Sequence, residues 1–131
     1  MSRQHRWPFF TRNRGNLKEI LTDRGLASLG DSYVNFAYSL ALSNRKREPE
    51  GTKVKGSILA QALRRAGLRE HLPSRMSRHA LADAAEALIV YAWLSDRLTL
   101  SECVKSLGKS DDPVDGFTRV LVTAKEKITF P

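Results

Sequence analysis

The chain has 131 residues, of which 41% are hydrophobic and 27% are charged, as expected for one globular domain with a single core. These proportions exclude collagen-like, low-complexity and wholly disordered chains. The 22 lysines and arginines outnumber the 14 acids, so the formal net charge is +8, which favours binding to a polyanion.

The sequence indicates neither a membrane protein nor a secreted one. The longer uncharged segments, 32–44 and 87–95, are well short of the roughly 20 apolar residues that span a bilayer. The basic N-terminus has only the apolar run 7–10, which is too short for a secretory signal. The single cysteine, Cys103, cannot form an internal disulfide. We therefore expect no membrane association and a cytoplasmic location.

The positive charge is concentrated in two blocks, with +4 in residues 1–14 and +7 in residues 45–78. We interpret residues 1–15 as a basic N-terminal arm and residues 16–131 as a single helical domain. The side chains assigned to a polyanion-binding surface are Arg45, Lys46, Arg47, Lys53, Lys55, Arg64 and Arg65. The alternative for the middle block is an ordinary solvated basic surface.

The first part of the chain predicts two helices and a loop. Asn16 and Glu19 have the spacing of a helix start, and Gly25 is expected to end that short helix. Residues 26–44 predict a second helix that buries one apolar face, because large apolar residues recur every three or four positions. The residues of that face are Leu26, Leu29, Tyr33, Phe36 and Leu40. Residues 45–51 predict a charged loop.

The middle of the chain predicts two more helices separated by a turn. Apolar residues between Thr52 and Ala66 have helical spacing, and Gly67 follows them at a position typical of a helix end. Residues 71–77, which contain a proline, predict a turn. The Ala- and Leu-rich segment from Ser77 or Arg78 to Leu94 predicts the central helix.

Two helices are predicted in the last part of the chain, which makes the expected class all-α. Thr99 and Glu102 form a capping box that opens a helix ended by Gly108. Asp112, followed by a proline, caps a last helix that runs to about Lys125.

Three acids occupy places where charge is costly. Asp31, Asp83 and Glu86 are the only charged residues in the two most apolar segments, 26–43 and 80–95. A carboxylate on a largely buried helix loses hydration unless a base, hydrogen bonds or a cation compensates it. Neither segment contains a lysine or arginine, so a divalent cation is one natural compensation. The alternative is that each acid faces solvent or pairs with an arginine from another segment.

Spacing allows these acids to share a metal. Asp83 and Glu86 are three positions apart, so on a helix their Cβ atoms lie roughly 5–6 Å from one another on one face. Asn35 lies one turn beyond Asp31, where it could orient a bound water or the carboxylate. Oxygen ligands without a His or Cys cluster suit Mg²⁺ or Mn²⁺ rather than Zn²⁺.

Three motifs occur in the order found in a known family. Residues 29–36, Leu-Gly-Asp-Ser-Tyr-Val-Asn-Phe, resemble the Leu-Gly-Asp signature helix of the ribonuclease III family. Residues 81–89, Leu-Ala-Asp-Ala-Ala-Glu-Ala-Leu-Ile, are similar to that family's second acidic motif. Residues 53–59, Lys-Val-Lys-Gly-Ser-Ile-Leu, are similar to its intervening helix. The resemblance extends over roughly residues 26–107.

The resemblance implies an all-helical endonuclease domain that forms a homodimer and cuts double-stranded or structured RNA. Carried over, Asp31, Asp83 and Glu86 are ligands of Mg²⁺ or Mn²⁺, and Asp31 and Glu86 are catalytic. A divalent cation suits phosphodiester hydrolysis because it activates water and stabilises charge on the reacting oxygens. Double-stranded RNA is recognised by shape and phosphates, which fits the diffuse basic block.

The chain departs from the family pattern in two ways. The family usually has a Glu four positions before the signature Asp, where this chain has Ala27, and neither Glu19 nor Asp23 is assumed to replace it. The compact mini-ribonuclease III branch also lacks that Glu, and by analogy with this branch the substrate would be ribosomal RNA. No double-stranded-RNA-binding domain is expected after Pro131.

Ala27 leaves a second functional class open. In that alternative the chain is a non-catalytic RNA-binding or ribosome-associated protein that keeps the fold. A third, more generic helical nucleic-acid-binding module predicts no clustering of the three acids in space.

Overall fold

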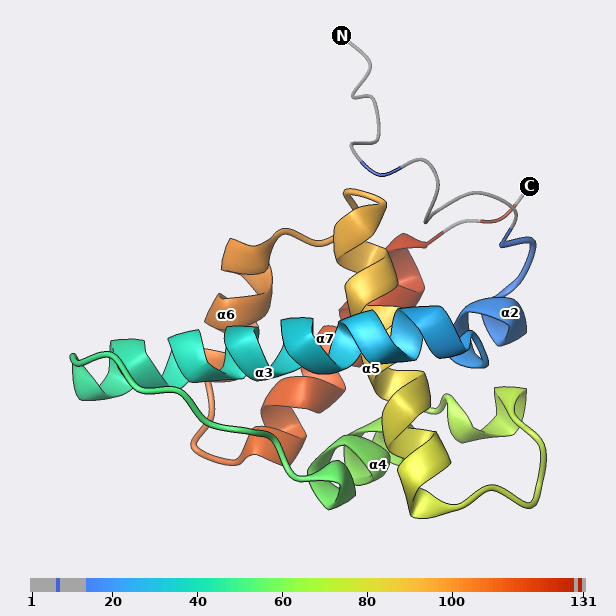
Figure 1. The fold of residues 1–131 in the computed structure, drawn as a ribbon, viewed down its shortest axis with the longest axis horizontal. Helices are drawn as coiled ribbons and strands as arrows, with labels where there is room; N and C mark the ends of the chain where they lie inside the picture. Colours follow the sequence, from blue (N-terminus) through green and yellow to red (C-terminus); the bar gives the residue numbers. More distant parts are fainter. Residues whose placement is uncertain (1–6, 8–13, 129, 131) are drawn as a thin grey trace, which may run out of the picture.

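The computed structural model describes Trp7, residues 14–128 and Phe130, and within these residues it is built from helices with no strand, which confirms the all-α class (Figure 1). The expected arm at residues 1–15 falls largely outside the described residues. The elements, with the short 3₁₀ turn named η1, are α2 (Leu17–Leu21), α3 (Arg24–Lys46), α4 (Gly56–Arg65), η1 (Arg69–His71), α5 (Arg78–Leu94), α6 (Leu100–Gly108) and α7 (Pro113–Lys127). None of these helices is long and apolar enough to cross a bilayer.

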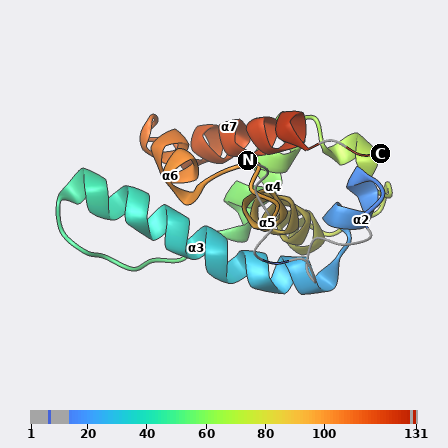
Figure 2. The same cartoon turned by 90° about the horizontal axis from the view of Figure 1, so that it is seen from above.

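Helix α5 is the centre of the molecule. It is buried along almost its whole length and packs against α2, α3, α4 and α7 (Figure 2). Its start is fixed by Ser77, whose side chain accepts a hydrogen bond from the Ala80 backbone N–H. Its many alanines let neighbouring helices approach from several sides. The predicted central helix is thus present, and it begins and ends at the predicted residues.

Helix α3 crosses α5 in close contact (Figure 1). A Cβ atom built on Gly30 would lie 2.2 Å from the backbone oxygen of Glu86. Real Cβ atoms do not approach so closely, so only glycine fits at this crossing. Gly30 therefore sets the distance between the helices that carry Asp31 and Glu86.

The start of α3 corrects one predicted boundary. The first helix ends at Leu21 rather than at Gly25, and Gly25 lies within the first turn of α3. The reason is Asp23, whose side chain accepts a hydrogen bond from the Leu26 N–H and so caps α3.

The buried face of α3 also differs from the predicted one. Leu29 and Phe36, expected in the core, are 41% and 55% exposed, and of the predicted set only Leu26 is fully buried. The residues that α3 buries are Leu26, Gly30, Val34, Ala37 and Ala41. Small side chains allow α3 to lie close to α5 and α6. The stabilisation from this close packing is larger than what burial of the larger apolar side chains on the neighbouring face would give.

The segment between α3 and α4 also differs from the prediction. Residues 45 and 46 still belong to α3, and the helix predicted from Thr52 begins at Gly56. Residues 50–54 form no helix because α3 side chains bind their backbone N–H and C=O groups.

The last two helices follow the prediction closely. The capping box of Thr99 and Glu102 is present at the start of α6. Asp112 caps α7, which ends at Lys127 rather than at about Lys125.

Candidate active site

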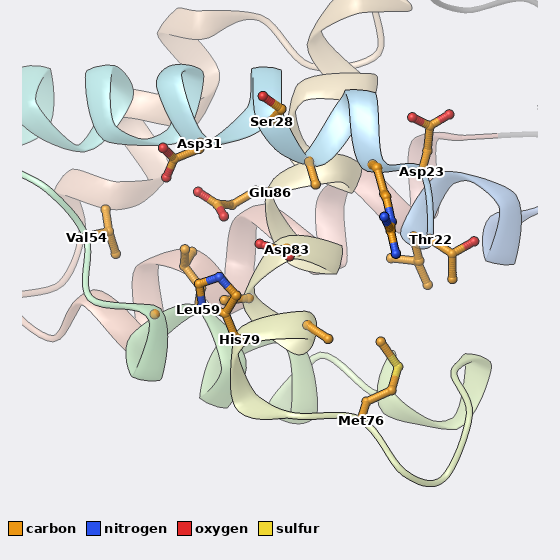
Figure 3. A pocket seen from close by; sticks show the side chains of 16 residues that line it. Thr22, Asp23, Ser28, Asp31, Val54, Leu59, Met76, His79, Asp83 and Glu86 are labelled. Atoms are coloured by element: carbon orange, nitrogen blue, oxygen red, sulfur yellow. The ribbon is translucent and has the colours of Figure 1, made fainter.

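The three acids singled out from the sequence line one cavity of about 790 Å³, between the first half of α3, the first half of α5 and the start of α4 (Figure 3). Asp31 comes from α3 and points toward Glu86 from α5. Asp83 comes from α5, one turn before Glu86. Asp31 and Glu86, which are 55 positions apart in the sequence, therefore meet at the crossing that Gly30 permits.

Glu86 is the buried member of the group. It is 6% exposed, whereas Asp83 is half-buried and Asp31 is exposed. Burial, a hydrogen bond with Asp31, and the negative charges of Asp31 and Asp83 together raise the pKa of Glu86 to about 8. Without a cation, Glu86 therefore holds a proton at neutral pH and can donate it to the Asp31 carboxylate.

The donor set fits Mg²⁺ or Mn²⁺ by its chemistry. Among the described residues, no three His, Cys, Asp or Glu side chains stand close enough to form a complete metal-binding group. Mg²⁺ commonly uses only one or two protein carboxylates and keeps several waters. The facing pair Asp31 and Glu86 provides such carboxylates, and Asp83 adds a third at the cavity wall.

Ala27 lines the cavity at the position where the resemblance led us to expect a Glu, so no carboxylate is present there. Neither nearby acid replaces it. Glu19 accepts a hydrogen bond from the Gly15 N–H at 2.8 Å. Asp23 also lines the cavity, but its carboxylate caps α3 and pairs with Arg14 at 2.8 Å. Both acids have structural partners, so the cavity has one carboxylate fewer than the family pattern.

Sequence reasoning missed several polar residues of the cavity. Arg24, Ser28 and His79 line it together with the acids. His79 lies one turn before Asp83 on α5, and this four-residue spacing was the available signal. Ser28 lies three positions before Asp31 within the predicted helix, so its spacing was also available, whereas Arg24 had no signal because the start of α3 was predicted two residues too late.

The seven predicted RNA-binding side chains divide into two groups. Three have acidic or carbonyl partners: Arg45 donates to Ser110 O at 2.9 Å, Lys46 pairs with Glu50, and Arg65 pairs with Asp115 at 2.9 Å. Four are exposed with no hydrogen bond or ion pair recorded within the described part of the chain. These are Arg47, Lys53, Lys55 and Arg64.

Two of the four unpaired cations lie next to the cavity. Lys53 and Lys55 flank Val54, which lines the cavity (Figure 3). Both are exposed, while Val54 is half-buried. Two exposed cations are therefore chain neighbours of a residue in the cavity lining, although neither belongs to the lining itself.

Comparison with known proteins identifies the family of the chain. A comparison with curated proteins gives no significant match. The family model described as Ribonuclease III matches residues 24–129, from the first residue of α3 to the residue beyond Ile128. Since the match includes both helices that carry the acids and nearly the whole chain, the protein belongs to the ribonuclease III family.

Proposed function

We propose that the protein is a divalent-metal-dependent endoribonuclease that hydrolyses phosphodiester bonds in double-stranded or structured RNA. Membership of the family indicates a nuclease that acts on RNA. The observation that carries the finer proposal is the convergence of Asp31, Asp83 and Glu86 on one cavity, where Asp31 and Glu86 face each other from two helices. By analogy with the compact branch of the family, ribosomal RNA precursors are the first natural substrates to test.

The facing pair Asp31 and Glu86 would hold the cation directly, and Asp83 at the cavity wall would reach it through one of the waters that Mg²⁺ keeps. A bound Mg²⁺ or Mn²⁺ supplies an activated water and stabilises charge on the phosphate oxygens. Glu86 must release its proton to become a ligand, because its pKa is raised by burial and by its acidic neighbours. Gly30 keeps Asp31 within reach of Glu86 by allowing α3 to touch α5.

The unpaired cations support a double-stranded substrate. Lys53 and Lys55 are the exposed chain neighbours of Val54 in the cavity lining, and Arg47 and Arg64 are exposed without an ion pair in the described part of the chain. A-form RNA is contacted through phosphates and 2′-hydroxyl groups rather than through base edges, so a dispersed set of cations suits it.

A homodimer is part of the same proposal. Leu29 and Phe36 are large, apolar and exposed on the helix that also carries Asp31. Exposed apolar side chains of this kind are typical of contact surfaces. A second copy packed on this face of α3 would place two cavities near one RNA duplex. Light scattering at micromolar concentration should give the mass of a dimer, and Phe36→Glu should give the monomer; a monomeric parent chain would refute this part.

The test of the function is incubation of a long labelled RNA duplex with the protein and Mg²⁺. We expect discrete products from the parent chain and none with EDTA or with Glu86→Gln. Glu126→Gln is the matched control, because Glu126 is an exposed acid on α7 away from the cavity and should cut as the parent does. Cleavage that persists in Glu86→Gln would refute the assigned site.

One observation favours a second candidate, a non-catalytic RNA-binding protein with this fold. Ala27 leaves the cavity one carboxylate short, and Glu19 and Asp23 are engaged elsewhere. In that case the duplex would be bound in Mg²⁺ and in Mn²⁺ but would remain intact.

A further inference from the structure

A polar stripe runs along α3 on the side that faces residues 50–54. Its members are four positions apart: Asp31, Asn35, Ser39 and Ser43. Four residues of an α-helix rise about 6 Å, which nearly matches two residues of extended chain at about 6.6 Å. Residues 50–54 run back along α3 in this register, bonded at every second residue (Figure 1).

The two serines of the stripe serve only to hold this segment. The Ser39 hydroxyl accepts from the Thr52 N–H at 2.9 Å and donates to Thr52 O at 3.0 Å. The Ser43 hydroxyl does the same with Glu50, at 2.9 Å and 3.2 Å. Each hydroxyl thus uses its one proton on the segment and has none left for another group.

Asn35 makes one contact with the segment and one with the site. Its Oδ1 accepts from the Val54 N–H at 2.8 Å, and its Nδ2 donates to Asp31 Oδ1 at 3.3 Å. The Val54 N–H is a donor and needs an acceptor, which in the Asn35 amide is Oδ1. The NH₂ group of the amide therefore faces Asp31. The orientation of the Asn35 amide is therefore set by the backbone of the segment.

We propose that Asn35 is a positioning residue for Asp31, and this inference rests on the proposed function. By holding one carboxylate oxygen of Asp31, Asn35 restricts the rotation of that side chain and leaves the other oxygen for a cation shared with Glu86. Because the same amide is fixed by Val54, the direction of the acid depends on the segment 50–54, whose Val54 also lines the cavity. Hydrogen-bond partners of metal ligands typically change metal affinity 10- to 100-fold when they are removed.

Two substitutions separate this role from support of the segment. Asn35→Ser places a hydroxyl where Ser39 and Ser43 show how serine binds this segment, so it keeps a bond to Val54 and loses the donor to Asp31. Ser39→Ala removes two bonds to the segment and leaves the donor to Asp31 in place.

Mn²⁺ binding by calorimetry and thermal unfolding are measured for both variants. We expect Asn35→Ser to weaken Mn²⁺ binding about 10-fold with little change in Tm, by the usual effect of a ligand's hydrogen-bond partner. Ser39→Ala should lower Tm and leave the Kd for Mn²⁺ within about twofold of the parent value. Unchanged Mn²⁺ binding in Asn35→Ser, or equal weakening in both variants, would overturn the proposal.

A metal-free measurement distinguishes failure of this inference from failure of the proposed function. In EDTA, the side-chain amide resonances of Asn35 should shift in Asp31→Ala and stay in place in Asp83→Ala. A parent chain that binds no Mn²⁺ would refute the proposed function, whereas amide resonances insensitive to Asp31→Ala would refute the positioning contact itself. This measurement also decides the question if Asn35→Ser fails to fold.

Discussion

Replacement of Gly30 by alanine tests the crossing on which the site depends. The added Cβ would lie 2.2 Å from the Glu86 oxygen, 2.5 Å from the Glu86 carbonyl carbon and 3.0 Å from the Glu86 Cβ. Two of these atoms belong to the α5 backbone and cannot rotate away, so α3 must move outward by about 1 Å to restore ordinary contact. This movement disturbs the packing of Val34 and Ala37, which are fully buried on the same face of α3.

The cost of Gly30→Ala follows from two opposing effects. Overpacking typically costs about 1–3 kcal/mol and occasionally more, and contacts with two backbone atoms place Gly30→Ala at the upper end, at about 3–4 kcal/mol. Alanine regains roughly 1 kcal/mol of this in helix propensity. We expect the free energy of unfolding to fall by about 2–3 kcal/mol, which lowers Tm by roughly 7–11 °C for a chain of this length. The separation of Asp31 from Glu86 should also weaken Mn²⁺ binding.

Thermal and urea unfolding followed by circular dichroism measure this cost. Gly108→Ala is the matched control, because Gly108 is the last residue of α6 and a Cβ atom added to it would meet nothing within 4 Å. This control should be neutral or slightly more stable. A Gly30→Ala protein as stable as Gly108→Ala would refute the close contact of α3 with α5.

Glu86→Gln should raise the free energy of unfolding at pH 7 in EDTA by on the order of 2 kcal/mol. The reason is that the Glu86 carboxyl ionises freely in the unfolded parent, whereas burial makes its ionisation unfavourable in the folded parent. The raised pKa of about 8 makes parent stability fall as pH rises from about 4.5 to 8, and urea titrations across this range should show no such fall in Glu86→Gln. Cys103 is fully buried and burial raises its pKa to about 12, so a thiol reagent should react only at the rate of unfolding; rapid labelling of the native protein would contradict this. Thr99→Ala removes the cap of α6 and should cost about 1 kcal/mol in urea unfolding. Hydrogen bonds to the Thr99 backbone, to Lys127 and to the Thr99 side chain lower the pKa of Glu102 to about 2. The stability that ionised Glu102 contributes should therefore be present above about pH 4.5 and be lost as the pH falls toward 2. If the free energy of unfolding of Glu102→Gln fell with acid as steeply as that of the parent, this would be contradicted.

Local signals in the sequence were sufficient for much of the fold. Ser77, Thr99 and Asp112 cap the helices that their positions predicted, because a cap is a contact between residues two or three apart. The acids of the site were also visible, since Asp31 and Glu86 are charges in segments that otherwise favour burial. Both kinds of signal depend on neighbours along the chain and require no knowledge of distant contacts.

Other features depended on which helix packs against which. The periodicity of large apolar residues on α3 predicted a buried face through Leu29 and Phe36, and the tertiary structure buries the small residues at Gly30 and Ala37 instead. A stripe of large side chains and a stripe of small ones have the same helical period, and only the partner helix selects between them.

The roles of individual polar side chains were decided in the same way. Asp23 is an acid near the site by sequence, yet it caps α3 and pairs with Arg14. Asn35 is placed between Asp31 and Val54 only because residues 50–54 fold back along α3. The sequence by itself determined the order of the main helices, the caps at Ser77, Thr99 and Asp112, and the acids that we propose carry the chemistry. The tertiary structure decided the buried face of α3, the burial of Glu86 and the partners of each polar group, because these depend on contacts between residues far apart in the chain.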